Sequence, residues 1–134
     1  MQLSLTLGTT DLEMTYDFYR QIPGLSVSWL SRSTDAGTSL MLCANNFKIV
    51  FLPLNTLEQQ HPVLFQHLSR TSLGAGMTLE FECPELDPIY LAARRNNWPI
   101  LYELDDREHL RRELWLQDPN GYLIAMNEEP PPVP

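Results

Sequence analysis

The second half of this 134-residue chain repeats the pattern of its first half, which restricts the fold to two copies of one module. With an offset of 74 residues and no gap, as from Leu3 to Met77, similar residues coincide from the start to the end of each half. Further matches pair Leu7 with Phe81, Tyr16 with Tyr90, Arg20 with Arg94, Leu40 with Leu114 and Val50 with Ile124. Because both ends of each half keep the same offset, we interpret the chain as a tandem duplication.

Each half predicts the element order strand, helix, strand, strand, strand. In the first half, residues 2–9 alternate polar and apolar side chains, and Thr10 and Glu13 fit a capping box that starts a helix running to about Gln21. Strands follow at 26–32, 38–43 and 47–53, with turns at 35–37 and 44–46. The second half predicts strands at 76–83, 99–105, 112–117 and 122–128 and a helix at 86–96. The predicted fold class is α+β, with two tandem βαβββ modules.

The modules predict a single domain over residues 1–128. The first module spans about 2–55, a less regular connector spans 56–75, and the second module spans about 76–128. Residues 129–134 include three consecutive prolines, which lack the N–H group that a strand ladder needs, so we expect a disordered tail.

Charge and hydropathy exclude two classes of partner. Seventeen acidic against nine basic residues give a net charge of −8, which disfavours nucleic acids and anionic membrane surfaces. No apolar run approaches the roughly 20 residues of a membrane span, and the N-terminus has no basic signal-peptide region. The two cysteines, Cys43 and Cys83, form neither a disulfide framework nor a metal-ligand spacing, so we expect reduced thiols in a cytoplasmic protein.

Three short motifs, together with the repeat, carry a family resemblance over residues 2–128. They are Asp11-Leu12-Glu13 after the first strand, Phe18-Tyr19-Arg20 in the helix, and the turn Asp118-Pro119-Asn120-Gly121 in the last hairpin. This combination resembles the vicinal-oxygen-chelate superfamily, which includes glyoxalase I, extradiol dioxygenases, fosfomycin-resistance enzymes and bleomycin-resistance proteins. The resemblance implies strands that form a cup-shaped sheet with the helices outside. It also implies a homodimer, because the family commonly covers exposed sheet edges by pairing subunits.

The resemblance further implies four positions for metal ligands, usually His on each first strand and Glu on each last strand. Counting seven residues back from Asp11 and Glu85 gives Ser4 and Thr78, and counting seven beyond Asp118 gives Ala125. The repeat pairs Ala125 with Phe51. None of the four residues Ser4, Phe51, Thr78 and Ala125 is a common ligand of a divalent cation, and two of them have no donor atom. We therefore predict no metal ion and no other cofactor.

No other pattern in the chain predicts a catalytic site. The spacing of His61, His67 and His109 does not bring the three imidazoles together. No motif supports a nucleophile with its base, and the scattered glycines form no phosphate-binding loop. We predict no catalytic residue.

Period-two alternation predicts what lines the cup. It places Ile49, Leu123 and Asn127 there from the last strands and leaves Leu114 and Leu116 under the helix. Trp115 offers a face for stacking or for a cation–π contact, and Glu80 or Glu113 could neutralise a cation. The predicted ligand-binding residues are Ser4, Thr6, Met41, Phe51, Thr78, Glu80, Glu113, Trp115 and Ala125.

This lining favours a binding protein over an enzyme. Closest in character is the bleomycin-resistance branch, which implies a metal-free antibiotic-resistance protein that binds a small cationic aromatic molecule in a cup at a dimer interface. The alternative is a metal-dependent lyase, isomerase or dioxygenase of the same superfamily with other ligands, for example Glu80, Glu113 and a histidine. A third reading is a degenerate member that acts as a structural or regulatory partner.

Overall fold

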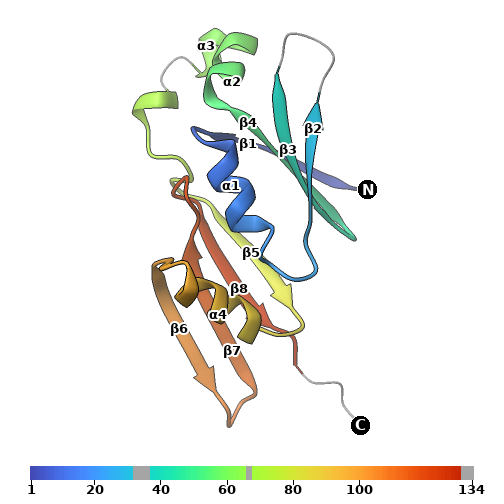
Figure 1. Cartoon of the computed structure of the whole chain (residues 1–134), viewed down its shortest axis with the longest axis vertical. Helices are drawn as coiled ribbons and strands as arrows, with labels where there is room; N and C mark the ends of the chain where they lie inside the picture. The colour runs from blue at the N-terminus through green and yellow to red at the C-terminus, as the bar shows by residue number, and fades with distance from the viewer. Residues whose placement is uncertain (32–36, 66–67, 131–134) are drawn as a thin grey trace. The chain divides into compact units, whose positions relative to one another are not determined.

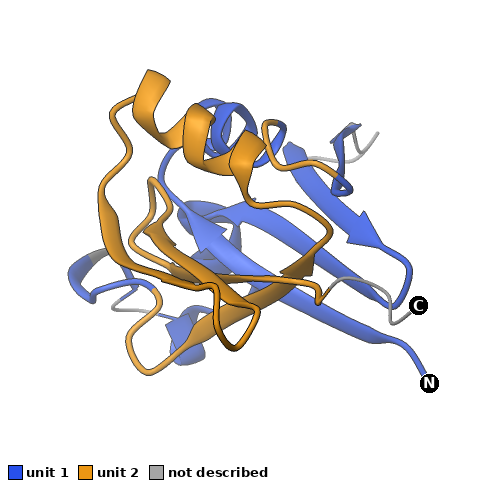
Figure 2. Cartoon of the chain, turned by 90° about the horizontal axis from the view of Figure 1, so that it is seen from below, with its two compact units in different colours: residues 1–20, 24–73 blue, residues 21–23, 74–134 orange. Residues whose placement is uncertain are grey.

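The structure is a computed structural model that describes residues 1–31, 37–65 and 68–130 (Figure 1). It divides into two compact units (Figure 2). The first unit comprises Met1–Arg20 and Gly24–Leu73, and the second comprises Gln21–Pro23 and Gly74–Pro134. Each unit contains one mixed four-stranded sheet with a helix between its first and second strands, which confirms the predicted α+β class and the two βαβββ modules. Position 32 of a predicted strand, the predicted turn at 35–36 and tail residues 131–134 lie outside the described residues.

The first unit has the strand order β1-β4-β3-β2, in which β1 runs parallel to β4 and the other neighbours are antiparallel. Its elements are β1 (Leu3–Thr9), α1 (Leu12–Tyr19), β2 (Ser26–Ser31), β3 (Thr38–Ala44) and β4 (Phe47–Pro53).

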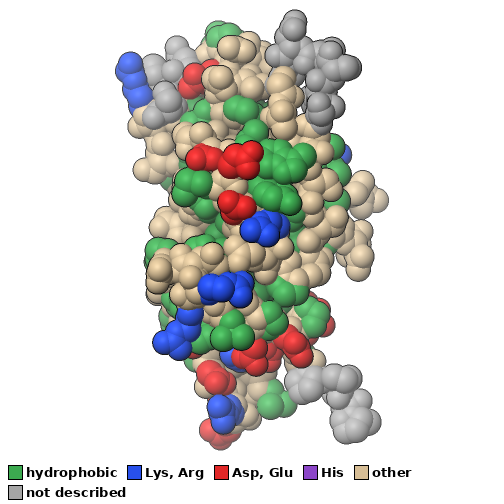
Figure 3. Space-filling model, viewed as in Figure 1, with side chains coloured by type: hydrophobic (Ala, Val, Ile, Leu, Met, Phe, Trp, Pro, Cys, Tyr) green, Lys and Arg blue, Asp and Glu red, His purple; other side chains and the backbone are tan. Residues whose placement is uncertain are grey.

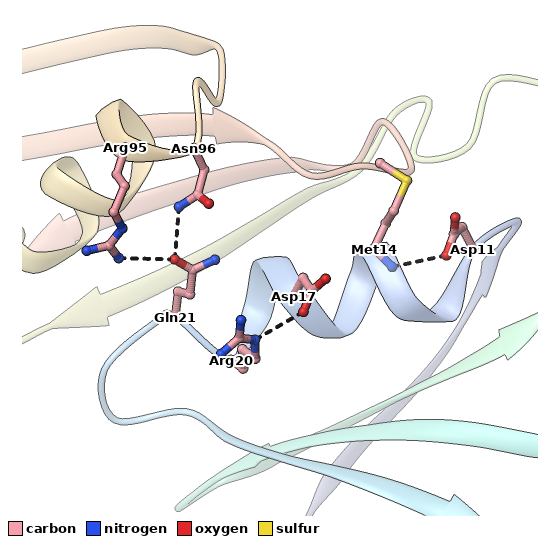
Figure 4. Close-up of polar contacts among 7 residues, drawn as sticks. All are labelled: Asp11, Met14, Asp17, Arg20, Gln21, Arg95 and Asn96. Carbon is pink, nitrogen blue, oxygen red and sulfur yellow. Dashed lines mark hydrogen bonds and ion pairs between the residues drawn. The ribbon is translucent and has the colours of Figure 1, made fainter.

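Helix α1 begins one residue later than the predicted capping box. Asp11 has an extended backbone, with φ −149° and ψ 101°, so its carboxylate accepts a hydrogen bond of 3.0 Å from the backbone N–H of Met14 (Figure 4). Asp11 is therefore the N-cap instead of Thr10. The helix ends at Tyr19, two residues before the predicted end, and an ion pair joins Arg20 to Asp17 at 3.1 Å.

One face of the first sheet packs against α1, and we call it the helix face. The Tyr19 ring lies 5.4 Å from the Phe51 ring, and Phe51 pairs with Leu7 on one side and with Leu40 on the other. All four side chains are buried. The alternate residues of each strand point to the opposite side, which we call the open face. It carries Ser4, Thr6 and Gly8 of β1, Met41 of β3 and Val50 of β4.

The segment predicted as an irregular connector forms helices in the first unit. They are α2 (Leu54–Gln60), α3 (Pro62–Phe65) and the short 3₁₀ helix η1 (Leu68–Arg70). Leu54 and Leu57 of α2 are buried over the Gly8 end of the open face, where any side chain at position 8 would collide with Leu54. Helix α2 has only these two buried residues and no side-chain cap, so the sequence carries little signal for it.

The second unit has the strand order β5-β8-β7-β6 and the same directions as the first. Its elements are β5 (Thr78–Cys83), α4 (Asp87–Arg95), β6 (Ile100–Asp106), β7 (Arg111–Gln117) and β8 (Leu123–Glu128).

Polar contacts fix both ends of α4. At its N-terminus, the Glu128 carboxylate accepts a hydrogen bond of 2.9 Å from the backbone N–H of Leu86, and Arg112 pairs with Asp87 at 2.7 Å. At its C-terminus, the side-chain oxygen of Gln21 accepts hydrogen bonds from Arg95 at 3.2 Å and from Asn96 at 2.9 Å (Figure 4). These contacts explain why the short segment Gln21–Pro23 belongs to the second unit.

The repeat contains one insertion that the ungapped alignment missed. Met41 pairs with Val50 in the first unit, whereas Trp115 pairs with Ala125 in the second, so the offset grows from 74 residues in β7 to 75 in β8. The extra residue lies in the turn between β7 and β8 of the second unit. There the buried Asp118 carboxylate accepts hydrogen bonds from the backbone N–H groups of Asn120 at 2.9 Å and Tyr122 at 2.8 Å. The structural mate of Ala125 is therefore Val50 instead of Phe51.

The surface mixes charges of both signs. On the face drawn in Figure 3, acidic and basic side chains lie interspersed among apolar and neutral ones. Within the described ranges, every helix is too short or too polar to cross a membrane.

Candidate ligand-binding site

The open face of the second unit brings several predicted site residues into one row. Strand register places Glu80 of β5 beside Ala125 of β8, Ala125 beside Trp115 of β7, and Trp115 beside Tyr102 of β6. Alternation adds further residues to the same face, and these are Thr78, Glu82, Glu113, Gln117, Leu123 and Asn127. Five of the nine predicted site residues therefore lie on this one face, and they are Thr78, Glu80, Glu113, Trp115 and Ala125.

An aromatic pair occupies one end of the row. The ring centroids of Tyr102 and Trp115 are 5.2 Å apart with an interplanar angle of 60°. Tyr102 is 45% exposed, so its ring is open to a ligand. The indole Nε1 of Trp115 is buried and has no hydrogen-bond partner in the described part of the chain. Tyr102 was absent from the predicted set, because a bulge between Ile100 and Tyr102 decides which β6 side chain meets Trp115.

Glu80 forms the other end of the row, and two further carboxylates, Glu82 and Glu113, lie in the neighbouring row. The Glu80 carboxylate accepts a hydrogen bond of 2.6 Å from the side-chain amide of Asn127. Asn127 lies between Glu82 and Glu113 in the strand register. Arg111 approaches Glu113 at 3.5 Å, and both side chains of this pair reach solvent. Three carboxylates around the Asn127 amide make this part of the face acidic and suited to a cationic group.

The open face of the first unit is different in character. Ser4 and Thr6 are exposed, and Met41 and Val50 are half-buried. Lys48 lies on the same face and pairs with Ser4. The first unit thus presents hydroxyl, apolar and basic groups where the second presents aromatic and acidic groups.

The predicted placement of Phe51 in the cup is wrong. Phe51 is fully buried on the helix face and packs against Tyr19, and Ile49 lies on that face as well. The cause is the extra residue in the turn between β7 and β8. Counting 74 residues back from Ala125 gives Phe51, which lies on the opposite face of β4 from the true mate, Val50.

The residues at the four metal-ligand positions do not fit a divalent cation. With the corrected register the set is Ser4, Val50, Thr78 and Ala125, which offers two neutral hydroxyls and two side chains without a donor. In addition, the described residues contain no group of three His, Cys, Asp or Glu side chains that could hold a metal ion.

The histidines do not complete an alternative metal set in the described structure. His61 follows α2, where its ring contacts Phe65. His109 lies in the turn between β6 and β7 and pairs through Nδ1 with Asp106 at 2.8 Å. His67 lies outside the described residues.

A cavity of about 340 Å³ lies in the second unit, and none of the predicted site residues lines it. Most charged side chains that line this cavity form ion pairs. Arg112 contacts Asp87 and Glu128, and Arg107 approaches Asp105 at 3.7 Å. The hydrogen bond to Asp87 raises the pKa of Arg112, so this guanidinium stays charged. Because its strongest charges are already paired, this cavity is a weaker ligand candidate than the open face.

The cysteine of the second unit is unsuited to nucleophilic chemistry. Burial, with a smaller contribution from Glu129, raises the pKa of the Cys83 thiol to about 11. A neutral, buried thiol is a poor nucleophile near neutral pH.

Comparison with known proteins identifies one family and several solved structures with a similar fold. The model of the family described as the glyoxalase/bleomycin resistance protein/dioxygenase superfamily matches residues 2–126. A search of curated proteins found no match.

Among solved structures, an antibiotic binding protein from Streptomyces sp. CB03234 is similar with a TM-score of 0.64 and 15% identity, covering 96% of this chain and 94% of that one. An integron cassette protein from V. cholerae gives a TM-score of 0.63 and 19% identity, with coverage of 96% and 94%. Lactoylglutathione lyase from Agrobacterium tumefaciens gives 0.59 and 15%, with coverage of 96% and 92%. At such identities the similarity establishes the fold, and each activity belongs to the neighbour that carries it.

Proposed function

We propose, from the premise that this chain belongs to the glyoxalase/bleomycin resistance protein/dioxygenase superfamily, that it is a binding protein for a small, cationic, aromatic organic molecule. In this proposal the ligand lies on the open face of the second unit and is held without a metal ion. The observation that carries the proposal is the row in which Glu80, Ala125, Trp115 and Tyr102 lie side by side.

The aromatic pair supports the ligand's aromatic and cationic character. A planar ligand can stack on the exposed ring of Tyr102, and its positive charge gains from the π-faces of Tyr102 and Trp115. A cation–π contact contributes about 0.5–2 kcal/mol, more as water is excluded.

The carboxylates of this face also support a positive charge on the ligand. Glu82 and Glu113 flank Asn127 in the strand register, so a cationic group above Asn127 has a carboxylate on either side, and Glu80 bonds to the Asn127 amide. Ala125 contributes only a buried methyl group between Glu80 and Trp115. The similar antibiotic binding protein from Streptomyces makes a drug-like ligand a reasonable first choice for this chain.

Isothermal titration calorimetry in the presence of a chelator tests the proposal. The panel contains metal-free bleomycin, planar aromatic cations, and neutral aromatic analogues of the same size. We expect saturable binding of at least one cation and weaker binding of its neutral analogue. Binding of the neutral analogues alone would contradict the cationic preference, and no binding across the panel would contradict the function.

The metal-dependent alternative is tested separately by elemental analysis. Protein purified without chelators should contain no stoichiometric divalent metal, because the four family positions supply no adequate ligand set. A stoichiometric transition metal that survives dialysis would overturn the proposal in favour of a metalloenzyme.

The proposal includes a homodimer, in which two copies cover sheet edges that one copy leaves open. Light scattering coupled to size-exclusion chromatography should give twice the mass of the chain. A monomer at every accessible concentration would contradict the proposed homodimer and would leave the proposed ligand binding untested by this experiment.

A further inference from the structure

Strand β2 is an edge strand with a free side. It pairs with β3 in an unbroken register from Ser26 to Ser31, and the described residues give it no strand neighbour on its other side. Alternate N–H and C=O groups along that side have no ladder partner, which is the arrangement that accepts a further strand.

The equivalent edge strand of the second unit is protected, and β2 is not. Strand β6 carries Glu103, Asp105 and Asp106 and a bulge at Ile100–Tyr102. Charges and bulges of this kind prevent edge-to-edge pairing. The β2 sequence Ser-Val-Ser-Trp-Leu-Ser has no charged residue, no proline and no bulge.

We infer that β2 pairs antiparallel with β2 of a second copy of this chain, about a two-fold axis at Ser28. The four-stranded sheet of each first unit thereby joins its counterpart into one continuous sheet. The inference rests on the homodimer of the proposed function and is independent of the ligand. It assigns the interface to one edge strand.

The side chains of β2 are self-complementary in this register. Pairing Ser28 with itself places Val27 of each copy opposite Trp29 of the other, and the two-fold axis keeps both on the helix face. Trp29 is 38% exposed and already contacts Tyr16 at 5.1 Å on its inner side. An aromatic ring opposite a β-branched residue is a favourable cross-strand pair.

Charge favours this strand as the meeting point of two identical chains. Each chain carries a net charge of −8, so two copies repel one another at most surfaces. The six residues of β2 contribute no charge, and therefore this edge avoids like charges in direct opposition.

Disulfide trapping tests the register. Directly opposed residues of antiparallel strands lie about 4.5–5.5 Å apart at Cα, which is within the range of disulfides. Under mild oxidation, Ser28→Cys should give a covalent dimer that is reversed by reductant. Glu103→Cys on the protected edge and the wild type, which retains Cys43 and Cys83, serve as matched controls. Equal cross-linking in Ser28→Cys and Glu103→Cys would overturn the register.

Charge insertion tests the interface without a new covalent bond. Ser28→Lys places two ammonium groups in opposition at the axis, and Glu103→Lys makes a comparable change on β6. We expect Ser28→Lys to elute as a folded monomer at concentrations where the wild type and Glu103→Lys are dimers, with unchanged circular dichroism.

The outcomes separate the two proposals. A dimeric wild type whose Ser28→Lys and Ser28→Cys variants behave like the controls would overturn β2 pairing and leave the homodimer intact. A monomeric wild type would overturn both. Neither result depends on whether a ligand binds.

Discussion

The two units share one topology but differ on their open faces. In the first unit, Gly8 and Leu52 pair beneath α2 and are buried. The equivalent pair in the second unit is Glu82 and Asn127, which is polar and reaches solvent, and the described residues after β8 form no helix over it. Both helix faces therefore specify the same fold, whereas the open face of the second unit carries the acidic and aromatic side chains to which we assign the proposed ligand.

The largest expected effect tests the register of β4, which places Phe51 on the helix face and Val50 on the open face. Phe51→Ala should lower the free energy of unfolding by about 3–5 kcal/mol, because it removes a fully buried ring under α1. Val50→Ala, on the open face, should cost about 1 kcal/mol. Urea denaturation measures both variants, and equal losses would show that Phe51 does not belong to the core.

The next effect concerns the aromatic pair. Trp115→Leu should weaken binding of a cationic aromatic about tenfold, since it removes a cation–π partner and leaves apolar bulk. Met41→Leu, at the equivalent position of the first unit, should leave the affinity unchanged. Calorimetry on both variants decides which unit carries the site, and a loss in Met41→Leu alone would reverse the assignment.

A smaller effect concerns charge. Glu80→Gln keeps an oxygen that accepts the hydrogen bond from Asn127 and removes the negative charge. It should weaken cation binding about two- to threefold, the scale of an exposed ion pair, and it should reduce the dependence of affinity on salt. Lys48→Gln in the first unit is the matched change and should not weaken binding. An unchanged salt dependence in Glu80→Gln would remove this carboxylate from the site.

The smallest effect compares the two thiols. Cys43 is half-buried in the first unit, and Cys83 is buried in the second with a pKa raised to about 11. Iodoacetamide should therefore modify Cys43 first in the folded protein. Mass spectrometry of tryptic peptides identifies the modified residue, and faster modification of Cys83 would contradict its burial.

The same pKa predicts the sign of a pH effect. Because the folded pKa of Cys83 lies above the ordinary thiol value of 9.0, the stability that the neutral thiol provides is complete below pH 9. This contribution is lost as the pH rises through about 11. Cys83→Ser should flatten the decline of stability over that interval.

Repetition and alternation predicted most of the fold from the sequence. The offset from Leu3 to Met77 located both modules, and each observed strand lies within about two residues of its predicted bounds. The inserted residue in the turn at Asp118 was not visible, because apolar residues on both faces of β4 tolerate a shift of one. That shift moved Phe51 from the core to the predicted site.

The candidate site was predicted only in part for a similar reason. Glu80, Glu113, Trp115 and Ala125 were placed on one face by period two, which the strand register of the second unit obeys. Tyr102 was missed because its partner depends on a bulge, a feature without a simple sequence signal. Helix α2 was missed because two leucines in a polar segment do not define an amphipathic helix.

The most direct test of the account follows the indole N–H signals of Trp29, Trp98 and Trp115 by nuclear magnetic resonance during titration. Single Trp→Phe variants assign the three signals, and a chelator excludes metal ions. With a bound cationic aromatic, the Trp115 signal should shift in a saturable manner while the Trp29 signal remains in place. A saturable shift of Trp29 without a shift of Trp115 would contradict the assignment of the ligand to the open face of the second unit.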